Sequence, residues 1–181
     1  MKISFCTADI PGRSFFDYCN TAREYGFDGF EISDPITERR HHSDSIFRDD
    51  MTQDCRRKLR NRRLSIPALS CPVPVDDPAL LSETLVKYID CANQAGVDTI
   101  IVRISGTDEN AYRDKLEKML AEAEKRAVSV LIETSGPLCR TETAVGVVRG
   151  FSSTALGVSW NVMETFFRGG ETAETSVKTL G

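Results

Sequence analysis

The sequence lacks the features of several common protein classes. No apolar run in its 181 residues approaches the roughly 18 residues that a membrane span requires. The N-terminal segment, Met1–Cys6, lacks the long apolar region of a signal peptide and itself predicts a strand. Six scattered cysteines, two histidines and no Cys-x-x-Cys pair favour reduced thiols in a cytoplasmic protein over a disulfide framework or a zinc site.

The chain also lacks a strong positive charge, since its net charge is −4. A nucleic acid is therefore disfavoured as the partner. Neither Gly-x-Gly-x-x-Gly nor Gly-x-x-x-x-Gly-Lys-Ser/Thr occurs, so the nucleotide-binding forms of an open α/β sheet are disfavoured. No linker or low-complexity segment divides the chain. We therefore expect a single domain over residues 1–181.

Short apolar segments alternate with segments of helical periodicity along the whole chain. The segments start roughly 30 residues apart, which is the size of a βα unit. This alternation predicts an α/β fold with a parallel sheet, doubly wound or closed as a barrel, and with helices outside it. The expected strands are Lys2–Cys6, Asp28–Ile32, Leu64–Leu69, Thr99–Ile104, Val128–Ile132 and Leu156–Trp160.

Three apolar stripes at helical spacing predict three of the helices. Asp77 followed by a proline is typical of a helix N-cap. Gly26 and Gly96 stand where a left-handed C-terminal cap is expected. The stripes are Phe15, Tyr18, Cys19, Ala22 and Tyr25; Leu81, Leu85, Tyr88, Ala92 and Ala95; and Tyr112, Leu116, Met119, Leu120 and Ala123.

Polar side chains follow or end four of the expected strands. Glu133 ends the run Val128–Ile132, and Asn161 follows Leu156–Trp160. Glu31 and Arg103 stand at or near the ends of two earlier strands. Because the carboxyl ends of parallel strands meet at one edge of the sheet, we expect these four residues to lie together there.

The chain resembles the xylose isomerase-like barrel superfamily, and within it the sugar phosphate isomerases and epimerases related to endonuclease IV. The resemblance rests on Glu133-Thr-Ser-Gly136 and on Trp160-Asn-Val-Met-Glu-Thr-Phe-Phe-Arg-Gly-Gly-Glu171, and it extends over nearly the whole chain. In that branch the fifth strand typically ends Glu-Thr-His-Asp and the sixth reads about Trp-Asp-Val-His-His. The resemblance implies a TIM-barrel-like fold of about six parallel strands, apparently truncated after the sixth βα unit.

The resemblance also implies a divalent cation, Mn, Mg or Zn, that polarises the oxygens of a sugar at the barrel mouth. Carried over residue by residue, Glu133 is the one retained carboxylate ligand. Asn161 replaces the second carboxylate, Ser135 and Gly136 replace His and Asp, and Met163 and Glu164 stand where paired His are expected. The ligands of later strands have no counterpart. We therefore expect a degraded metal site in which Glu133 is a weak candidate ligand.

Each candidate residue also has an interpretation without a ligand. Glu133 and Glu31, the candidate catalytic carboxylates, could form structural ion pairs instead. Arg103 could bind a phosphate or carboxylate of the substrate, or pair with either glutamate. Trp160 could stack on a sugar, although packing in the core is the more common role of such a tryptophan. Asn161 is a further candidate for substrate binding.

Two classes of function follow from the resemblance. The first is a metal-dependent isomerase or epimerase of a sugar or polyol derivative. The second is an inactive or truncated barrel that binds a ligand or a protein partner. An open six-stranded sheet exposes the edges of its first and last strands, so we expect self-association as a two-fold dimer. A competing expectation is that a helix over Thr172–Leu180 folds across the gap and leaves a monomer.

Overall fold

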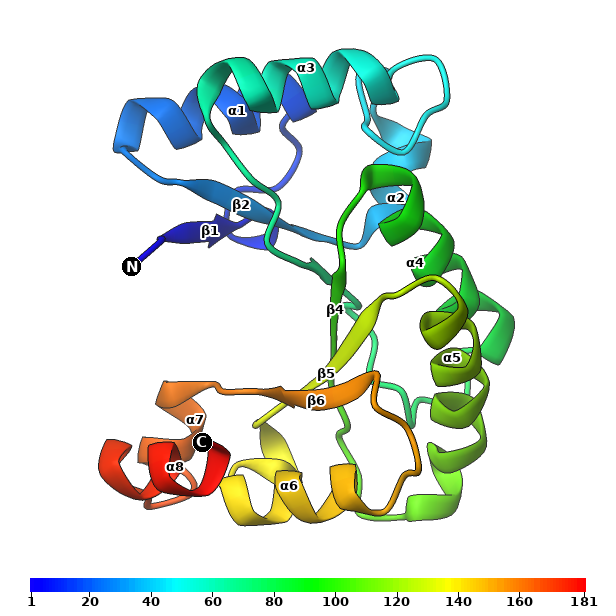
Figure 1. Ribbon diagram of the computed structural model, residues 1–181, viewed down its shortest axis with the longest axis vertical. Helices are drawn as coiled ribbons and strands as arrows, with labels where there is room; N and C mark the ends of the chain where they lie inside the picture. The colour runs from blue at the N-terminus through cyan, green and yellow to red at the C-terminus, as the bar shows by residue number, and fades with distance from the viewer.

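The computed structural model describes all residues, 1–181, and contains one parallel sheet of six strands in chain order. Each strand pairs with the next one along the chain, and β1 does not pair with β6. The sheet therefore curves like part of a barrel wall without closing, and the protein has the shape of a letter C (Figure 1). The strands are β1 Ser4–Cys6, β2 Gly29–Ser33, β3 Leu69–Ser70, β4 Thr99–Val102, β5 Ser129–Glu133 and β6 Leu156–Ser159.

Helices cover the outer, convex side of the sheet, while the concave side faces the open centre of the C (Figure 1). The predicted α/β, TIM-barrel-like architecture with an incomplete sheet is thus confirmed. The helices are α1 Phe15–Tyr25, α2 Pro35–His41, α3 Thr52–Arg62, α4 Ser82–Ala95, α5 Arg113–Lys125, α6 Thr141–Arg149, α7 Val162–Phe167 and α8 Ala173–Leu180.

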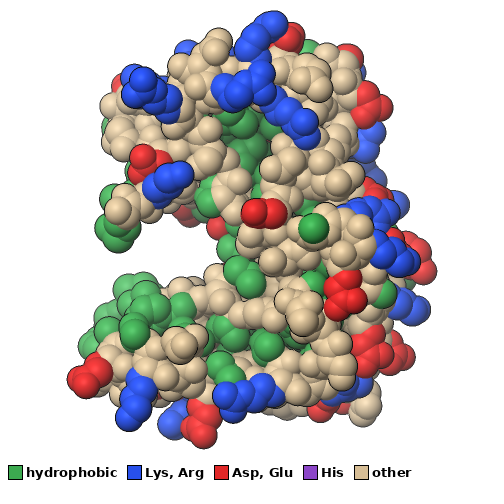
Figure 2. All heavy atoms as spheres, viewed as in Figure 1, with side chains coloured by type: hydrophobic (Ala, Val, Ile, Leu, Met, Phe, Trp, Pro, Cys, Tyr) green, Lys and Arg blue, Asp and Glu red, His purple; other side chains and the backbone are tan.

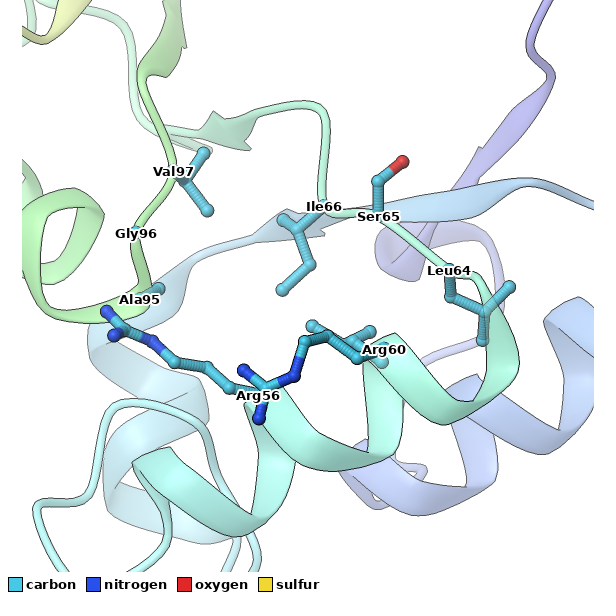
Figure 3. A pocket seen from close by; sticks show the side chains of 9 residues that line it. Arg56, Arg60, Leu64, Ser65, Ile66, Ala95, Gly96 and Val97 are labelled. Atoms are coloured by element: carbon cyan, nitrogen blue, oxygen red, sulfur yellow. The ribbon is translucent and has the colours of Figure 1, made fainter.

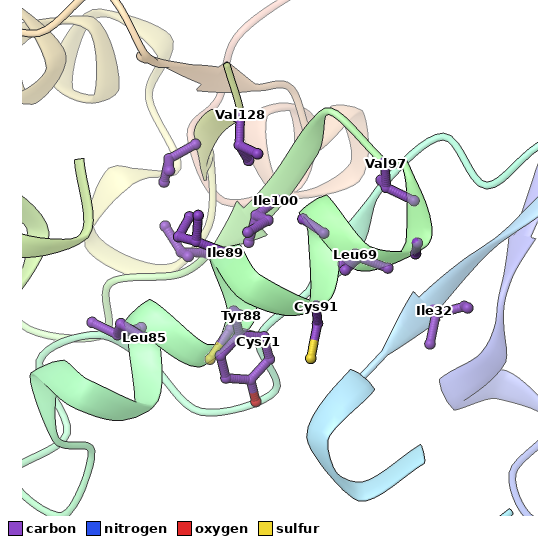
Figure 4. Close-up of a cluster of buried hydrophobic side chains, with 14 of the residues drawn as sticks. Ile32, Leu69, Cys71, Leu85, Tyr88, Ile89, Cys91, Val97, Ile100 and Val128 are labelled. Atoms are coloured by element: carbon purple, nitrogen blue, oxygen red, sulfur yellow. The ribbon is translucent and has the colours of Figure 1, made fainter. Parts of the chain in front are cut away.

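The alternation of side chains along each strand decides which residues form the core. On β5, Val130 and Ile132 are fully buried beneath the helices, whereas Leu131 and Glu133 are only partly buried on the concave side. Residues that pair across neighbouring strands face the same side of the sheet. Ile100 of β4 pairs with Val130 and is likewise fully buried on the side covered by the helices. The result is one cluster of 35 buried apolar residues between the sheet and the helices (Figure 4).

Two predicted helix ends are confirmed by their backbone geometry. Gly26 and Gly96 follow α1 and α4 with φ angles of 74° and 71°, the left-handed conformation that glycine adopts without steric strain. The start of α1 is also well specified, because the Ser14 hydroxyl and the Asp17 carboxylate form a reciprocal capping box.

Three local predictions are wrong. Asp77 does not cap a helix, because its carboxylate accepts a hydrogen bond from the Ala79 amide in a turn, and α4 begins only at Ser82. Leu81 therefore precedes the helix and is 60% exposed instead of joining its apolar stripe. Tyr25, the last residue of α1, is 71% exposed and does not join the apolar stripe of that helix.

The third strand is much shorter than the predicted run Leu64–Leu69. Pro67 lies within that run and has no backbone N–H to donate, so regular pairing is interrupted there. A single bridge, Gly29 to Ser65, precedes the interruption, and β3 itself begins only at Leu69.

The helix predicted over Thr172–Leu180 exists as α8, with Thr172 as its N-cap, but it does not cross the gap. It packs against α6 and α7 on the arm that ends the chain (Figure 1). Apolar side chains gather on the surface of this arm (Figure 2), and the exposed ones are Val162, Met163, Phe166, Phe167 and Val177. No helix has the length and apolar character that crossing a bilayer requires.

Candidate functional site

A polar pocket lies where β4, β5 and β6 end, which is the edge of the sheet that carries active sites in βα barrels. Its volume of about 380 Å³ is in the range of small-molecule sites. Its lining is mostly polar, with Pro74 and Ile104 as the apolar side chains. The lining residues are Pro74, Arg103, Ile104, Ser105, Glu133, Ser135, Gly136, Asn161, Glu164 and Arg168.

Glu133 and Asn161 are joined directly in this pocket. The Asn161 Nδ2 donates a hydrogen bond to Glu133 Oε1 at 3.0 Å. The Oδ1 of the same amide accepts from the Glu164 N–H at 3.1 Å and so caps the start of α7. Both ends of the amide are therefore in use, and the two partners fix its orientation because only the oxygen can accept from an N–H.

Arg103 is held in the pocket without a carboxylate partner. Its guanidinium donates to the Pro72 carbonyl at 2.7 Å, and the side chain is otherwise exposed. No ion pair links it to Glu133 or Glu31, the two partners expected as alternatives. Most of its five donors thus remain available to an anionic group of a ligand.

Two charged residues of the pocket were not predicted as site residues. Glu164 lies in α7 and Arg168 follows one turn later at the end of that helix. Arg168 Nη1 lies 3.4 Å from Glu164 Oε2. The Gly136 amide donates to the same carboxylate oxygen at 3.4 Å and links α7 to the end of β5. The i, i+4 spacing of the two charges after a strand end was the signal that could have identified them.

Asp76 supports the pocket from behind the β4 end. Its carboxylate accepts hydrogen bonds from the Ser105 amide and the Ser105 hydroxyl, both at 2.8 Å. Burial by itself raises the pKa of Asp76, but these hydrogen bonds outweigh it and hold the pKa below its usual range. Asp76 is therefore an anion that positions Ser105 at the pocket wall.

Glu31 and Trp160 lie outside the pocket lining. Glu31 is the third of five residues in β2, so it stands within the strand and not at its end. Its Oε1 accepts from the Cys6 thiol at 3.5 Å, and burial raises the pKa of that thiol to about 11. Trp160 is half-buried, and its indole N–H donates to the Thr165 hydroxyl at 2.8 Å, which ties β6 to α7. The structure thus brings Arg103, Glu133 and Asn161 together without these two.

The donor set of the pocket does not fit a divalent cation. No three His, Cys, Asp or Glu side chains converge so as to hold a metal ion anywhere in the protein. At Glu133 the neighbouring group is an amide whose N–H points at the carboxylate and whose oxygen is used by α7. The second carboxylate of the lining, Glu164, accepts from the Gly136 N–H and is paired with Arg168. This set falls short of the several converging oxygen or nitrogen ligands that Mg²⁺, Mn²⁺ or Zn²⁺ require.

Comparison with solved structures finds the same fold in larger barrels. The chain is similar to 3-keto-D-glucoside 4-epimerase from E. coli, with 12% sequence identity over 99% of this chain and 75% of that one, and a TM-score of 0.77. A D-tagatose 3-epimerase-like protein gives 13% identity over 99% and 71% of the two chains, with a TM-score of 0.75. The IOLI protein with a bound zinc atom gives 16% identity over 97% and 67%, with a TM-score of 0.72.

A sequence search finds no matching curated protein. In contrast, the model of one protein family matches residues 19–180, nearly the whole chain, and this range includes every residue that lines the pocket. The matched family is described as xylose isomerase-like TIM barrel. This chain therefore belongs to the xylose isomerase-like TIM barrel family.

Proposed function

We propose that the pocket binds a small sugar or polyol derivative that carries an anionic group, and that it does so without a tightly bound divalent cation. The single observation that carries this proposal is the pairing of Glu133 with Asn161 in a pocket that also holds Arg103. A carboxylate and an amide are groups that bind hydroxyls, and an unpaired guanidinium binds a carboxylate or phosphate.

The pocket residues divide into two groups by the part of the ligand that they would contact. The second Nδ2 hydrogen of Asn161, Glu133 Oε2 and the Ser135 hydroxyl would exchange hydrogen bonds with ligand hydroxyls at the ends of β5 and β6. Arg103 would bind the anionic group at the end of β4. The solved structures to which this chain is similar include sugar epimerases, which supports a sugar-like ligand over other polar molecules.

Sugar isomerisation or epimerisation is the second candidate function. It is favoured by Glu133, a carboxylate at the pocket that could accept a proton from a ligand carbon or hydroxyl. Glu31 is a weaker candidate for the same role, because it is engaged with Cys6 outside the pocket lining. Two of the similar solved structures contain a divalent cation, zinc in one and magnesium in the other. The donor set here does not provide such a site.

Calorimetric titration in EDTA tests the binding proposal. Sugars, sugar acids and sugar phosphates are titrated into the wild-type chain and into Arg103→Ala. We expect saturable binding of an acidic member of this panel, weakened about tenfold or more in Arg103→Ala, since a charge-assisted contact is worth about 1.5–3 kcal/mol. Arg149→Ala, an exposed arginine on α6 outside the pocket, is the matched control and should bind normally.

The outcome also separates the two candidate functions. Binding in EDTA without turnover supports a ligand-binding role, whereas turnover that requires added Mn²⁺ or Zn²⁺ and is lost in Glu133→Gln supports the isomerase. Binding of no member of the panel by the wild-type chain would contradict the proposal.

We further propose that the protein self-associates as a two-fold dimer in the cytoplasm. The edges of β1 and β6 are unpaired, and the apolar side chains of α7 and α8 lie exposed on the arm beside β6. A second copy that covers this side would remove both features from water. All six cysteines are free thiols, which supports a reducing compartment.

A further inference from the structure

A second charged hollow lies at the end of the molecule opposite the pocket. It is formed where α1 and α3 end, just before the chain enters β2 and β3. Its volume is about 450 Å³, and its lining contains neither an apolar nor an acidic side chain. The lining residues are Arg23, Asn61, Arg62 and Arg63. Basic side chains gather over this end of the molecule (Figure 2).

The three arginines of this hollow have no carboxylate partner. Neither Arg23, Arg62 nor Arg63 lies within 4.0 Å of an acidic oxygen, and Arg62 donates only to the neutral Asn20 amide oxygen. Arg57, on the same helix, is paired with Asp54 at 2.8 Å instead. Unpaired positive charge is therefore concentrated in the hollow, in a chain whose net charge is −4.

Arg63 occupies a backbone position that favours glycine. It caps α3 with a φ of 56°, whereas α1 and α4 end on Gly26 and Gly96 in the same left-handed conformation. A side chain in this conformation is strained. Cations near a helix C-terminus do complement its dipole. Arg60, one turn earlier in α3, already provides that interaction without strain, so the dipole does not account for arginine at position 63.

The neighbouring hollow on the other side of α3 is built differently (Figure 3). Arg56 and Arg60 lie over a floor that includes Leu64, Ile66 and Val97. The Arg56 guanidinium donates to the Gln94 carbonyl at 2.7 Å, so it holds the end of α4 in place. This hollow thus has an apolar floor and an arginine with a structural role, whereas the hollow at Arg63 is lined entirely by polar side chains that can donate hydrogen bonds.

We propose that the hollow formed by Arg23, Asn61, Arg62 and Arg63 binds the phosphate group of a small molecule. Three guanidinium groups and one carboxamide can donate hydrogen bonds from several directions to a tetrahedral dianion. Planar guanidinium groups bind phosphate oxygens in pairs, which makes such contacts stronger than those of a point charge. The site is separate from the pocket at Arg103 and does not depend on the proposed function of that pocket.

Titration with inorganic phosphate, followed by amide NMR spectra of the whole chain, tests this proposal. We expect saturable shifts of the Arg63 and Arg23 amide signals, and apparent affinity lowered about tenfold or more in Arg63→Gly. Glycine relaxes the left-handed position, so this variant should be at least as stable as the wild type. Arg57→Ala removes the same charge from the same helix outside the hollow and should bind phosphate normally.

Two further arms separate this site from other sources of binding. The titration is repeated in Arg103→Ala, where signals at Arg63 should shift as before even if the pocket no longer responds. A single-stranded oligonucleotide is tested in competition with phosphate. If Arg63→Gly and Arg57→Ala weaken phosphate binding equally, the binding comes from a diffuse positive field, and the proposal is overturned. Tight oligonucleotide binding that depends on both residues, or no shift at Arg63 with phosphate, would overturn it as well.

Discussion

The side-chain amide of Asn161 donates a hydrogen bond to the Glu133 carboxylate across the ends of β5 and β6, at 3.0 Å. The amide oxygen caps α7 through the Glu164 N–H. In this arrangement an internal donor occupies one oxygen of the Glu133 carboxylate at the place where the resemblance implies a cation. The consequence is a polar pocket at the ends of β4, β5 and β6 in which no three His, Cys, Asp or Glu side chains converge on one point.

Glu38 predicts an unusual dependence of stability on pH. Its side chain is 8% exposed, and burial, together with the Asp44 charge, raises the pKa of Glu38 to about 7 from an ordinary 4.5. Its Oε1 has no hydrogen-bond partner, and Oε2 lies 3.6 Å from His42 Nε2. Because the folded state has the higher pKa, it binds more protons than the unfolded state between these two pH values.

The contribution of Glu38 is therefore fully present below about pH 4.5 and is lost as the pH rises through about 7. We expect this loss to reach at most about 3.5 kcal/mol, since each unit of pKa is worth about 1.4 kcal/mol. Urea unfolding of the wild type and of Glu38→Gln over this pH range measures it. The difference in unfolding free energy between the two should change with pH, and a constant difference would count against the assignment.

Glu171 predicts a large loss of stability on truncation. Its carboxylate is 7% exposed and accepts hydrogen bonds from the Thr141 amide, the Thr141 hydroxyl and the Ser176 hydroxyl, at 3.0, 2.8 and 2.9 Å. Although burial raises the pKa of Glu171, these hydrogen bonds outweigh it and hold the pKa low. The stabilisation is thus present at neutral pH and is lost as the pH falls through the lowered folded-state pKa.

Glu171→Ala should lower the unfolding free energy by about 3 kcal/mol at neutral pH, because buried donors on α6 and α8 lose their acceptor. Hydrogen exchange of the α8 amides should accelerate, since this carboxylate joins α8 to α6. Glu24→Ala, an exposed glutamate on α1, is the control and should change stability by less than about 0.5 kcal/mol. Unchanged exchange in α8 would show that the carboxylate does not hold that helix.

Two glycine positions predict effects of opposite sign. A Cβ at Gly29 would lie 2.0 Å from the Ser65 carbonyl oxygen, so Gly29→Ala must separate β2 from the chain before β3. We expect a loss of at least about 2 kcal/mol. Gly146 lies within α6 with open space around it, and Gly146→Ala should add about 0.5–1 kcal/mol. Thermal unfolding of both variants tests the packing, and a neutral Gly29→Ala would show that β2 and β3 are not so close.

Much of the fold could be predicted because strand order follows from local patterns. Apolar runs separated by helical stripes indicate parallel strands in sequence, and Gly26 and Gly96 mark helix ends through backbone sterics alone. Pro67 and Asp77 show where such patterns are insufficient. The proline interrupts a run that otherwise reads as a strand, and the aspartate closes a turn where a helix start was expected.

The candidate site could be predicted only in part. Glu133 and Asn161 stand at the ends of neighbouring strands, so their proximity could be predicted. Their hydrogen bond could not, because it depends on the orientation of the Asn161 amide, whose oxygen also caps α7. Glu31 followed the same pattern as Glu133 and yet stands within its strand beside Cys6. The pairing register between strands decides whether a carboxylate lies within its strand or at the end of it. This register cannot be predicted from a local sequence pattern.

The open edges predict a dimer in solution. Light scattering at micromolar concentration should give about 40 kDa, twice the chain mass of 20.1 kDa. Ile3→Lys, on the exposed edge beside β1, should reduce assembly and solubility together, because the charge would be buried in the interface. Leu81→Lys, at a similarly exposed leucine before α4, should leave the dimer intact. A stable species of the chain mass would contradict the dimer.

The central claim, that Asn161 takes the place of a metal ligand beside Glu133, is tested most directly by calorimetric titration with Mn²⁺. The wild-type chain should show no saturable binding in the micromolar range. Asn161→Asp keeps the helix cap and adds a charged ligand, so it should bind Mn²⁺ about tenfold more tightly or better. Near-stoichiometric binding of Mn²⁺ by the wild type, lost in Glu133→Ala, would contradict the account.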